Sequence, residues 1–74
     1  MDLRIRDLRE DSDLTQKEVA AFLHCDQSLY SKYERGERPL PLDLAEQLAD
    51  YYHTSVDYIL GRTEIMAPYP KKKP

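Results

Sequence analysis

The sequence predicts an all-α fold built from five short helices in a single domain. Apolar residues recur at helical spacing, capping residues mark helix starts, and proline, glycine or polar triplets mark helix ends. No segment shows the apolar/polar alternation of a strand. With 74 residues and one cysteine, the chain is near the lower size limit for one core and has no intramolecular disulfide. We therefore expect the fold to be stabilised by packing alone.

Residues 2–10 predict the first helix, in which Ile5 and Leu8 form a short apolar stripe. The triplet 11–13, Asp-Ser-Asp, predicts a tight turn after it, because aspartate tolerates the left-handed conformation that closes a helix.

The second helix is expected at about residues 16–23. Thr15 is the predicted N-cap, and Glu18, three residues later, completes a capping box. Leu14 is spaced to pack on the first turn as a hydrophobic staple. The residues expected on the buried face are Val19, Ala20, Phe22 and Leu23.

The third helix is expected at about residues 27–35, with Asp26 as N-cap and Gly36 at its end. Tyr30 and Tyr33 share one side, and we interpret them as core residues with outward-reaching hydroxyls rather than as a base-stacking platform. The opposite side is polar and contains no acid. Its residues are Gln27, Ser28, Ser31 and Lys32.

A fourth helix is predicted from about Pro41 to Tyr52, since proline is tolerated in a first turn. Ser55 can cap a final helix over residues 56–60, closed by Gly61. The helical domain thus covers residues 1–63. Residues 64–74 are rich in proline and lysine and predict a mobile tail.

The second and third helices form a closely connected pair that must cross at a steep angle, and Ala20 supplies the small residue at the crossing. The third helix can then enter the major groove of DNA. Gln27 can pair with adenine, Ser28 can bond several bases, and Lys32 can reach guanine or a phosphate. Gln16, at a helix N-terminus, is placed to contact a phosphate.

These residues carry a resemblance to a known family. The segments 14–20 (Leu-Thr-Gln-Lys-Glu-Val-Ala) and 27–36 (Gln-Ser-Leu-Tyr-Ser-Lys-Tyr-Glu-Arg-Gly) resemble the helix-turn-helix of the phage lambda repressor and Cro family, also called the xenobiotic-response-element family. The resemblance covers roughly residues 3–61. It implies a five-helix, lambda-repressor-like DNA-binding domain that regulates transcription, commonly as a homodimeric repressor on a palindromic operator.

The resemblance also assigns roles to individual residues. It implies a phosphate contact for Gln16, base-facing positions for the third helix, and DNA-backbone contacts for Arg35 and Arg38. His24 departs from the family, which usually has glycine at this turn position with positive φ. The expected DNA-binding residues are Gln16, Gln27, Ser28, Ser31, Lys32, Arg35 and Arg38.

Composition restricts the function classes. The net charge of −3 and pI near 5.2 oppose DNA binding, so the cations of residues 27–39 must carry much of the attraction. No catalytic constellation, cofactor motif or metal-ligand spacing is present, so an enzyme is not expected, nor a metal, cofactor or small-molecule substrate. No signal peptide or membrane-spanning run is found, and we expect a cytoplasmic protein.

Three alternatives remain open at this point. The helix-turn-helix could serve as an interaction scaffold for a protein partner, as in an antitoxin, because Tyr51, Tyr52, Tyr58 and Ile59 could form an apolar seam. The same seam would suit a homodimer. Cys25 is expected to pack as a small apolar residue rather than act as a redox sensor. Residues 71–73, three lysines, could bind phosphates or act only as a solubilising tail.

Overall fold

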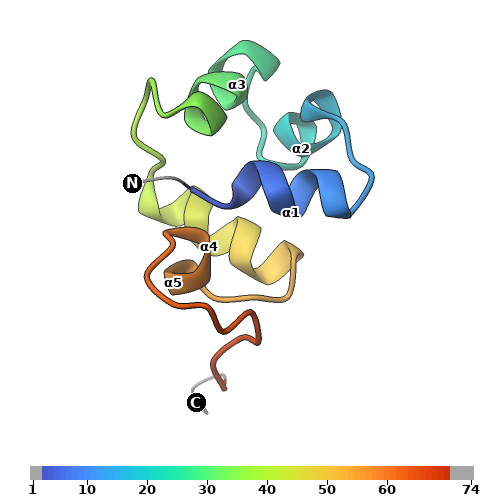
Figure 1. Ribbon diagram of the computed structural model, residues 1–74. Coiled ribbons are helices and arrows are strands. Elements are labelled where there is room, and N and C mark those ends of the chain that lie inside the picture. Colours follow the sequence, from blue (N-terminus) through green and yellow to red (C-terminus); the bar gives the residue numbers. More distant parts are fainter. Residues whose placement is uncertain (1–2, 71–74) are drawn as a thin grey trace.

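The computed structural model describes residues 3–70, and within that range it contains helices and no strand. The elements are α1 (Ile5–Asp11), α2 (Gln16–Phe22), α3 (Gln27–Arg35), α4 (Leu42–Tyr51) and α5 (Val56–Ile59). Figure 1 shows α2 and α3 above α1, with α4 and α5 below it. The predicted all-α, five-helix fold is confirmed, although α1 begins only at Ile5.

Helix starts follow the capping residues in the sequence. The Thr15 hydroxyl accepts from the Glu18 amide and the Glu18 carboxylate accepts from the Thr15 amide, which confirms the predicted capping box. Ser55 caps α5 by accepting from the Tyr58 amide. Asp26 occupies the N-cap position of α3 as predicted, but its side chain makes no capping hydrogen bond.

A residue with positive φ follows each of the five helices, and after α5 it is Gly61, at 76°. Asp13, His24 and His53 have φ values of 57°, 57° and 58°, and Gly36 ends α3 at 74°. The positive φ predicted for the turn at His24 is therefore confirmed in a residue with a β-carbon, which costs about 1 kcal/mol of backbone strain. These turns reverse the chain within few residues and let five short helices share one core.

The core takes side chains from every helix. The largest fully buried side chains are Ile5, Val19, Tyr30, Leu48 and Ile59. Ala20 is also buried, in keeping with a small residue between α2 and α3. The core position of Tyr30 and Tyr33 is confirmed, but the outward-reaching hydroxyl is wrong for Tyr30. Its hydroxyl is buried, and burial, followed by the nearby Glu34 carboxylate, raises the pKa of Tyr30 far above its ordinary value.

The sequence predicts Phe22 on the buried face of α2, and this prediction is wrong. Its side chain is 39% exposed and packs against Tyr51 of α4, with ring centroids 4.3 Å apart. At about 100° per residue, Val19, Ala20 and Leu23 fill an arc that faces the core, and Phe22 falls at the edge of that arc. Phe22 is therefore left partly exposed, with the Tyr51 ring as its aromatic neighbour.

Arg4 joins the beginning of the domain to its end, in an arrangement we call the Arg4 clasp. Its amide donates to the Ile59 carbonyl (2.9 Å), its guanidinium donates to the Thr63 carbonyl (2.9 Å), and it lies 4.3 Å from the centroid of the Tyr58 ring. An ion pair with Glu64 completes the clasp. The first helix and the last are thereby held together.

Part of the segment expected to be a mobile tail contacts α5 and the loop before it. The Thr54 hydroxyl donates to the Met66 carbonyl, and the Tyr69 hydroxyl donates to Asp57 at 2.7 Å. Mobility of residues 64–70 stays a prediction. Residues 71–74, with the three lysines, lie outside the described residues.

Candidate nucleic-acid interface

A shallow groove runs along the exposed side of α3 where the N-terminus of α2 meets it. Its volume is about 520 Å³. The residues that line it are Gln16, Gln27, Ser28, Ser31, Lys32 and Arg35. Six of the seven residues expected from the sequence are thus brought together, and none of the lining residues is an acid. The seventh, Arg38, is exposed beyond Gly36 and outside the groove.

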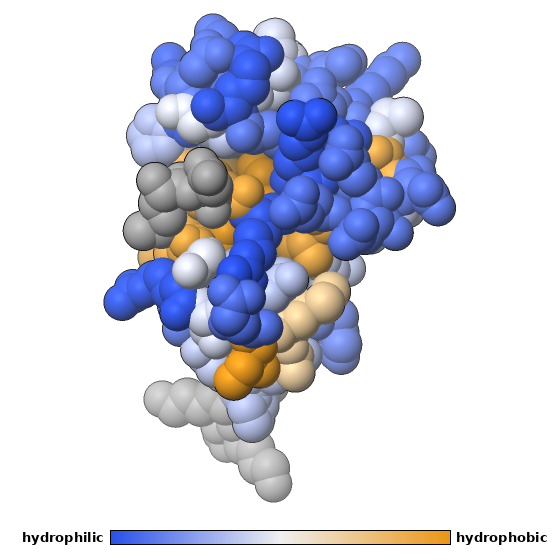
Figure 2. Space-filling view, viewed as in Figure 1, coloured by the Kyte–Doolittle hydropathy of each residue, from blue (hydrophilic) through white to orange (hydrophobic). Residues whose placement is uncertain are grey.

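The groove lies on α2 and α3, and its lining residues are polar or basic. Figure 2 shows hydrophilic residues over the upper part of this face, where Figure 1 places α2 and α3, and apolar residues lower down, towards α4 and α5. Gln27, Ser28 and Lys32 are exposed, and Ser31 is half-buried. Gln27, Ser28 and Lys32 are therefore placed to meet a polar partner on the exposed side of α3.

A buried ion pair fixes the end of α3 to α1. The Arg9 guanidinium donates from Nε to Glu34 Oε2 at 2.7 Å and from Nη2 to Oε1 at 3.2 Å, while its Nη1 donates to the Leu14 carbonyl at 2.9 Å. Only 13% of the Arg9 side chain and 3% of the Glu34 side chain are exposed. Sequence reasoning missed this pair, because a separation of 25 positions leaves no local signal.

Gln16 joins this buried network. Its side-chain amide donates to Glu34 Oε1 at 3.0 Å, so one carboxylate receives donors from α1 and α2 while belonging to α3. Burial alone would raise the pKa of Glu34, but the hydrogen bonds from Arg9, the neighbouring Tyr30 hydroxyl and the Gln16 amide together outweigh it and lower the pKa below its ordinary value of 4.5. The amide that we expected at a phosphate is therefore held at the groove edge by an ionised carboxylate.

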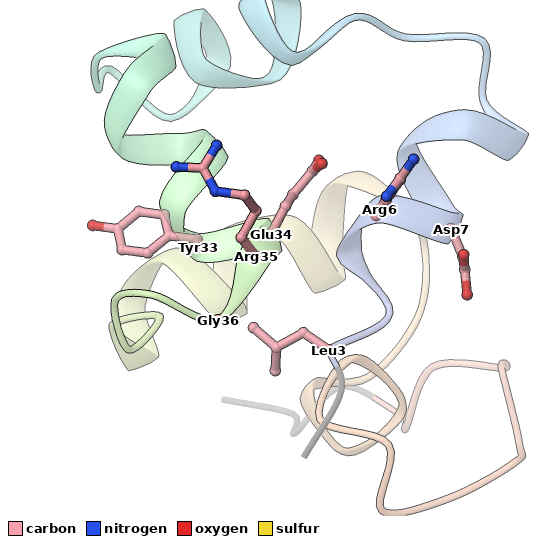
Figure 3. Close-up of a pocket in the computed structure, with 7 residues that line it drawn as sticks. All are labelled: Leu3, Arg6, Asp7, Tyr33, Glu34, Arg35 and Gly36. Atoms are coloured by element: carbon pink, nitrogen blue, oxygen red, sulfur yellow. The ribbon is translucent and has the colours of Figure 1, made fainter.

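Arg35 belongs to a second, exposed network at the same end of α3. Its Nε donates to Glu37, and its Nη1 donates to the Ser31 hydroxyl at 2.7 Å. Figure 3 shows that Glu34 and Arg35 leave the last turn of α3 in different directions. They line a cavity of about 310 Å³ between this turn and α1, together with Leu3, Arg6, Asp7, Tyr33 and Gly36. Of these two consecutive residues, Glu34 makes its contacts inside the domain and Arg35 makes its contacts on the surface.

The apolar seam considered for a partner or a second copy is largely absent from the surface. Ile59 is fully buried, Tyr52 is buried, and Tyr58 lies under the Arg4 guanidinium. Tyr51 alone of the four is exposed, at 44%, beside the exposed Phe22. The seam, which the sequence left open as an alternative, is therefore not continuous on the surface, because Ile59 of α5 and Tyr52 after α4 are buried within the domain.

The comparison with protein families decides the classification. A helix-turn-helix domain family matches residues 3–58, which include all five helices except the last residue of α5. The chain belongs to the helix-turn-helix domain family. The resemblance to lambda repressor and Cro-like regulators, and the fold class that it implied, are confirmed.

Three curated proteins are similar to this helix-turn-helix chain. The uncharacterised HTH-type transcriptional regulator YobD of Bacillus subtilis (strain 168) is 39% identical over 95% of this chain and 62% of its own length. The HTH-type transcriptional regulator ImmR of the same organism is 36% identical over 84% of this chain and 49% of its own length. The cryptic phage CTXphi transcriptional repressor RstR of Vibrio cholerae is 34% identical over 82% of this chain and 55% of its own length.

The helix-turn-helix chain therefore spans about half to three fifths of the length of these relatives. No solved structure gave a significant match. The family and its named regulators are not enzymes, which confirms the expectation of a non-enzymatic domain. In the part of the chain that is described, no helix is long and apolar enough to cross a membrane.

Proposed function

We propose that this helix-turn-helix domain is a sequence-specific transcriptional regulator that binds double-stranded DNA by inserting α3 into the major groove. The observation that carries the proposal is the acid-free groove lined by six polar or basic residues of α2 and α3. A major groove about 12 Å wide admits one helix, and such a surface offers donors to base edges and cations to phosphates. The similarity to named transcriptional regulators supports the same reading.

The proposed roles divide along α3. Gln27 and Ser28, exposed in its first turn, read base edges, with Ser31 and Lys32 one turn further on. Gln16, Arg35 and Arg38 anchor the DNA backbone. Gln16 is pre-positioned for this role, because its bond to Glu34 limits the rotamers that the side chain would otherwise sample.

We further propose that the protein acts in the cytoplasm as a homodimeric repressor on a palindromic operator. Two copies of α3 would then enter successive major grooves about 34 Å apart. In vitro selection from pooled random duplexes, followed by size-exclusion chromatography of the complex, tests this. A two-fold symmetric consensus and two copies per duplex are expected. Enrichment of no sequence, with capture of a protein partner instead, would contradict the proposal and favour an interaction scaffold.

Replacing Gln27 by alanine is expected to remove discrimination at one base pair of the selected site, about 1–3 kcal/mol. Binding titrations on the site and on its single-base variants measure the effect. Gln47→Ala, an exposed glutamine of α4, is the matched control and should leave every affinity unchanged. Equal weakening by Gln27→Ala on all duplexes would contradict a base-reading role.

A further inference from the structure

The chain turn that ends α3 places an acidic residue, Glu37, beside the basic side chains of α3. Gly36 adopts the left-handed conformation with φ 74°, and the Glu37 amide then donates to the Lys32 carbonyl at 2.9 Å. This bond satisfies a carbonyl in the last turn and fixes the backbone of Glu37 beside α3. The position of the Glu37 side chain is therefore set by the way the helix ends.

From that position Glu37 forms an ion pair with Arg35. The Arg35 Nε donates to the Glu37 carboxylate, and both side chains are about half exposed, at 54% and 53%. The pKa of Glu37 is lowered, chiefly by this hydrogen bond. Desolvation has a smaller, opposite effect, and the positive charges of Arg35 and Lys32 lower the pKa further. The carboxylate is thus ionised and opposes two cations of the groove.

The same pair also constrains a base-facing residue. While Nε of Arg35 is bound to Glu37, Nη1 of the same guanidinium donates to the Ser31 hydroxyl at 2.7 Å. The planar guanidinium therefore lies along the exposed side of α3, between Ser31 and Glu37. In this state two of the five N–H donors of the guanidinium and one lone pair of the Ser31 oxygen are engaged within the protein.

We infer that Glu37 is an internal competitor for the phosphate-binding site of Arg35, so that DNA binding exchanges a carboxylate for a phosphate at the Arg35 guanidinium. The inference rests on the proposed function. Because the exchange involves the DNA backbone, it lowers affinity for every sequence by the same factor and leaves the discrimination between sequences to the base-facing residues. In an acidic chain, Glu37 thereby sets the strength of non-specific binding.

The experiment measures binding of the full chain to pooled random-sequence duplexes at moderate salt. Glu37→Gln keeps the size of the side chain and removes its charge, and it is expected to raise affinity about two- to fivefold, the range that follows from the strength of an exposed ion pair. Glu46→Gln is the matched control, because it removes the same charge from an exposed position on α4. The control should change affinity less than Glu37→Gln does.

The decisive measurement repeats both substitutions in an Arg35→Ala background. If Glu37 acts through Arg35, Glu37→Gln then gains no more than Glu46→Gln. A full gain that persists without Arg35 would overturn the inference, since Glu37 would then act on DNA directly. An unchanged affinity in the Glu37→Gln single variant would also overturn it. Failure of the unsubstituted chain to bind any duplex overturns the proposed function, and the inference with it, and is distinguishable from both results.

Discussion

Two arginine–glutamate pairs lie at the end of α3, one inside the domain and one on its surface. Both place a carboxylate oxygen on the arginine Nε, yet the side chains of the Arg9–Glu34 pair are 13% and 3% exposed, against 54% and 53% for Arg35–Glu37. The buried pair connects three helices through Glu34. The exposed pair connects residues two positions apart and borders the groove.

The difference teaches that identical groups have different tasks because their surroundings differ. Removing one member of a buried pair leaves a charge without a partner in a poorly solvated site, whereas water replaces either member of an exposed pair. The Arg9–Glu34 pair therefore contributes to the stability of the domain. The Arg35–Glu37 pair can open at little free-energy cost, as a contact that exchanges with a ligand must.

The largest expected effect comes from breaking the buried pair. Glu34→Gln should lower the free energy of unfolding at neutral pH by about 3 kcal/mol, the low end for a broken buried pair, since Arg9 keeps some contact with water. Chemical denaturation measures it. The contrast between the two pairs fails if Glu37→Gln, the matched change in the exposed pair, destabilises the domain as much.

The loss of stability in Glu34→Gln is expected to depend on pH. The folded-state pKa of Glu34 lies below its ordinary value of 4.5, so the stability that it contributes is fully present above that value and is lost as pH falls through the lower folded-state pKa. The difference in unfolding free energy between the unsubstituted domain and Glu34→Gln should therefore shrink in acid. A difference that is constant with pH would show that the charge of Glu34 is not its source.

Replacing Arg35 by alanine should weaken DNA binding without destabilising the domain. Loss of one phosphate contact is expected to make the slope of log affinity against log salt shallower by about one unit, equally for all duplexes. Affinity titrations at several salt concentrations measure the slope. Arg62→Ala, an exposed arginine after α5, is the control. An unchanged slope would place Arg35 outside the interface.

Gln16 contacts the buried pair through Glu34 and also lines the groove. Its substitution should have the smallest effects, one on stability and one on DNA binding. Gln16→Ala removes a hydrogen bond to Glu34 and is expected to lower the free energy of unfolding by about 1 kcal/mol. It should also weaken DNA binding modestly on every sequence. Thermal unfolding and DNA titration on one preparation measure both. A loss of stability alone would assign Gln16 to the interior.

The fold could be predicted from the sequence wherever the deciding interaction is local. The Thr15–Glu18 capping box, the left-handed turn at His24 and the Gly36 helix end each depend on residues within a few positions of one another. Phe22 was placed wrongly because the width of a buried stripe depends on what the rest of the chain packs against it. Burial of Ile59, which interrupts the seam considered as an alternative, has the same origin.

The candidate site divides in the same way. Residues on one side of one helix, such as Gln27, Ser28 and Lys32, follow from helical periodicity alone, and the structure brings them into one groove. Arg9 and Glu34 could not be paired from the sequence, because helices that pack together put distant residues in contact. Glu37 could have been noticed, since a glycine at the helix end directs the next residues back towards the last turn.

The Arg4 clasp has a consequence for the kinetics of folding. It joins Arg4 to Thr63 across a sequence separation of 59, almost the entire described chain, whereas α2 and α3 are neighbours in sequence. Closing so long a loop has an entropic cost that is offset only when the helices between its ends have packed. We therefore expect the helix-turn-helix to form early and the clasp to close last, as the step that completes cooperative folding of the domain.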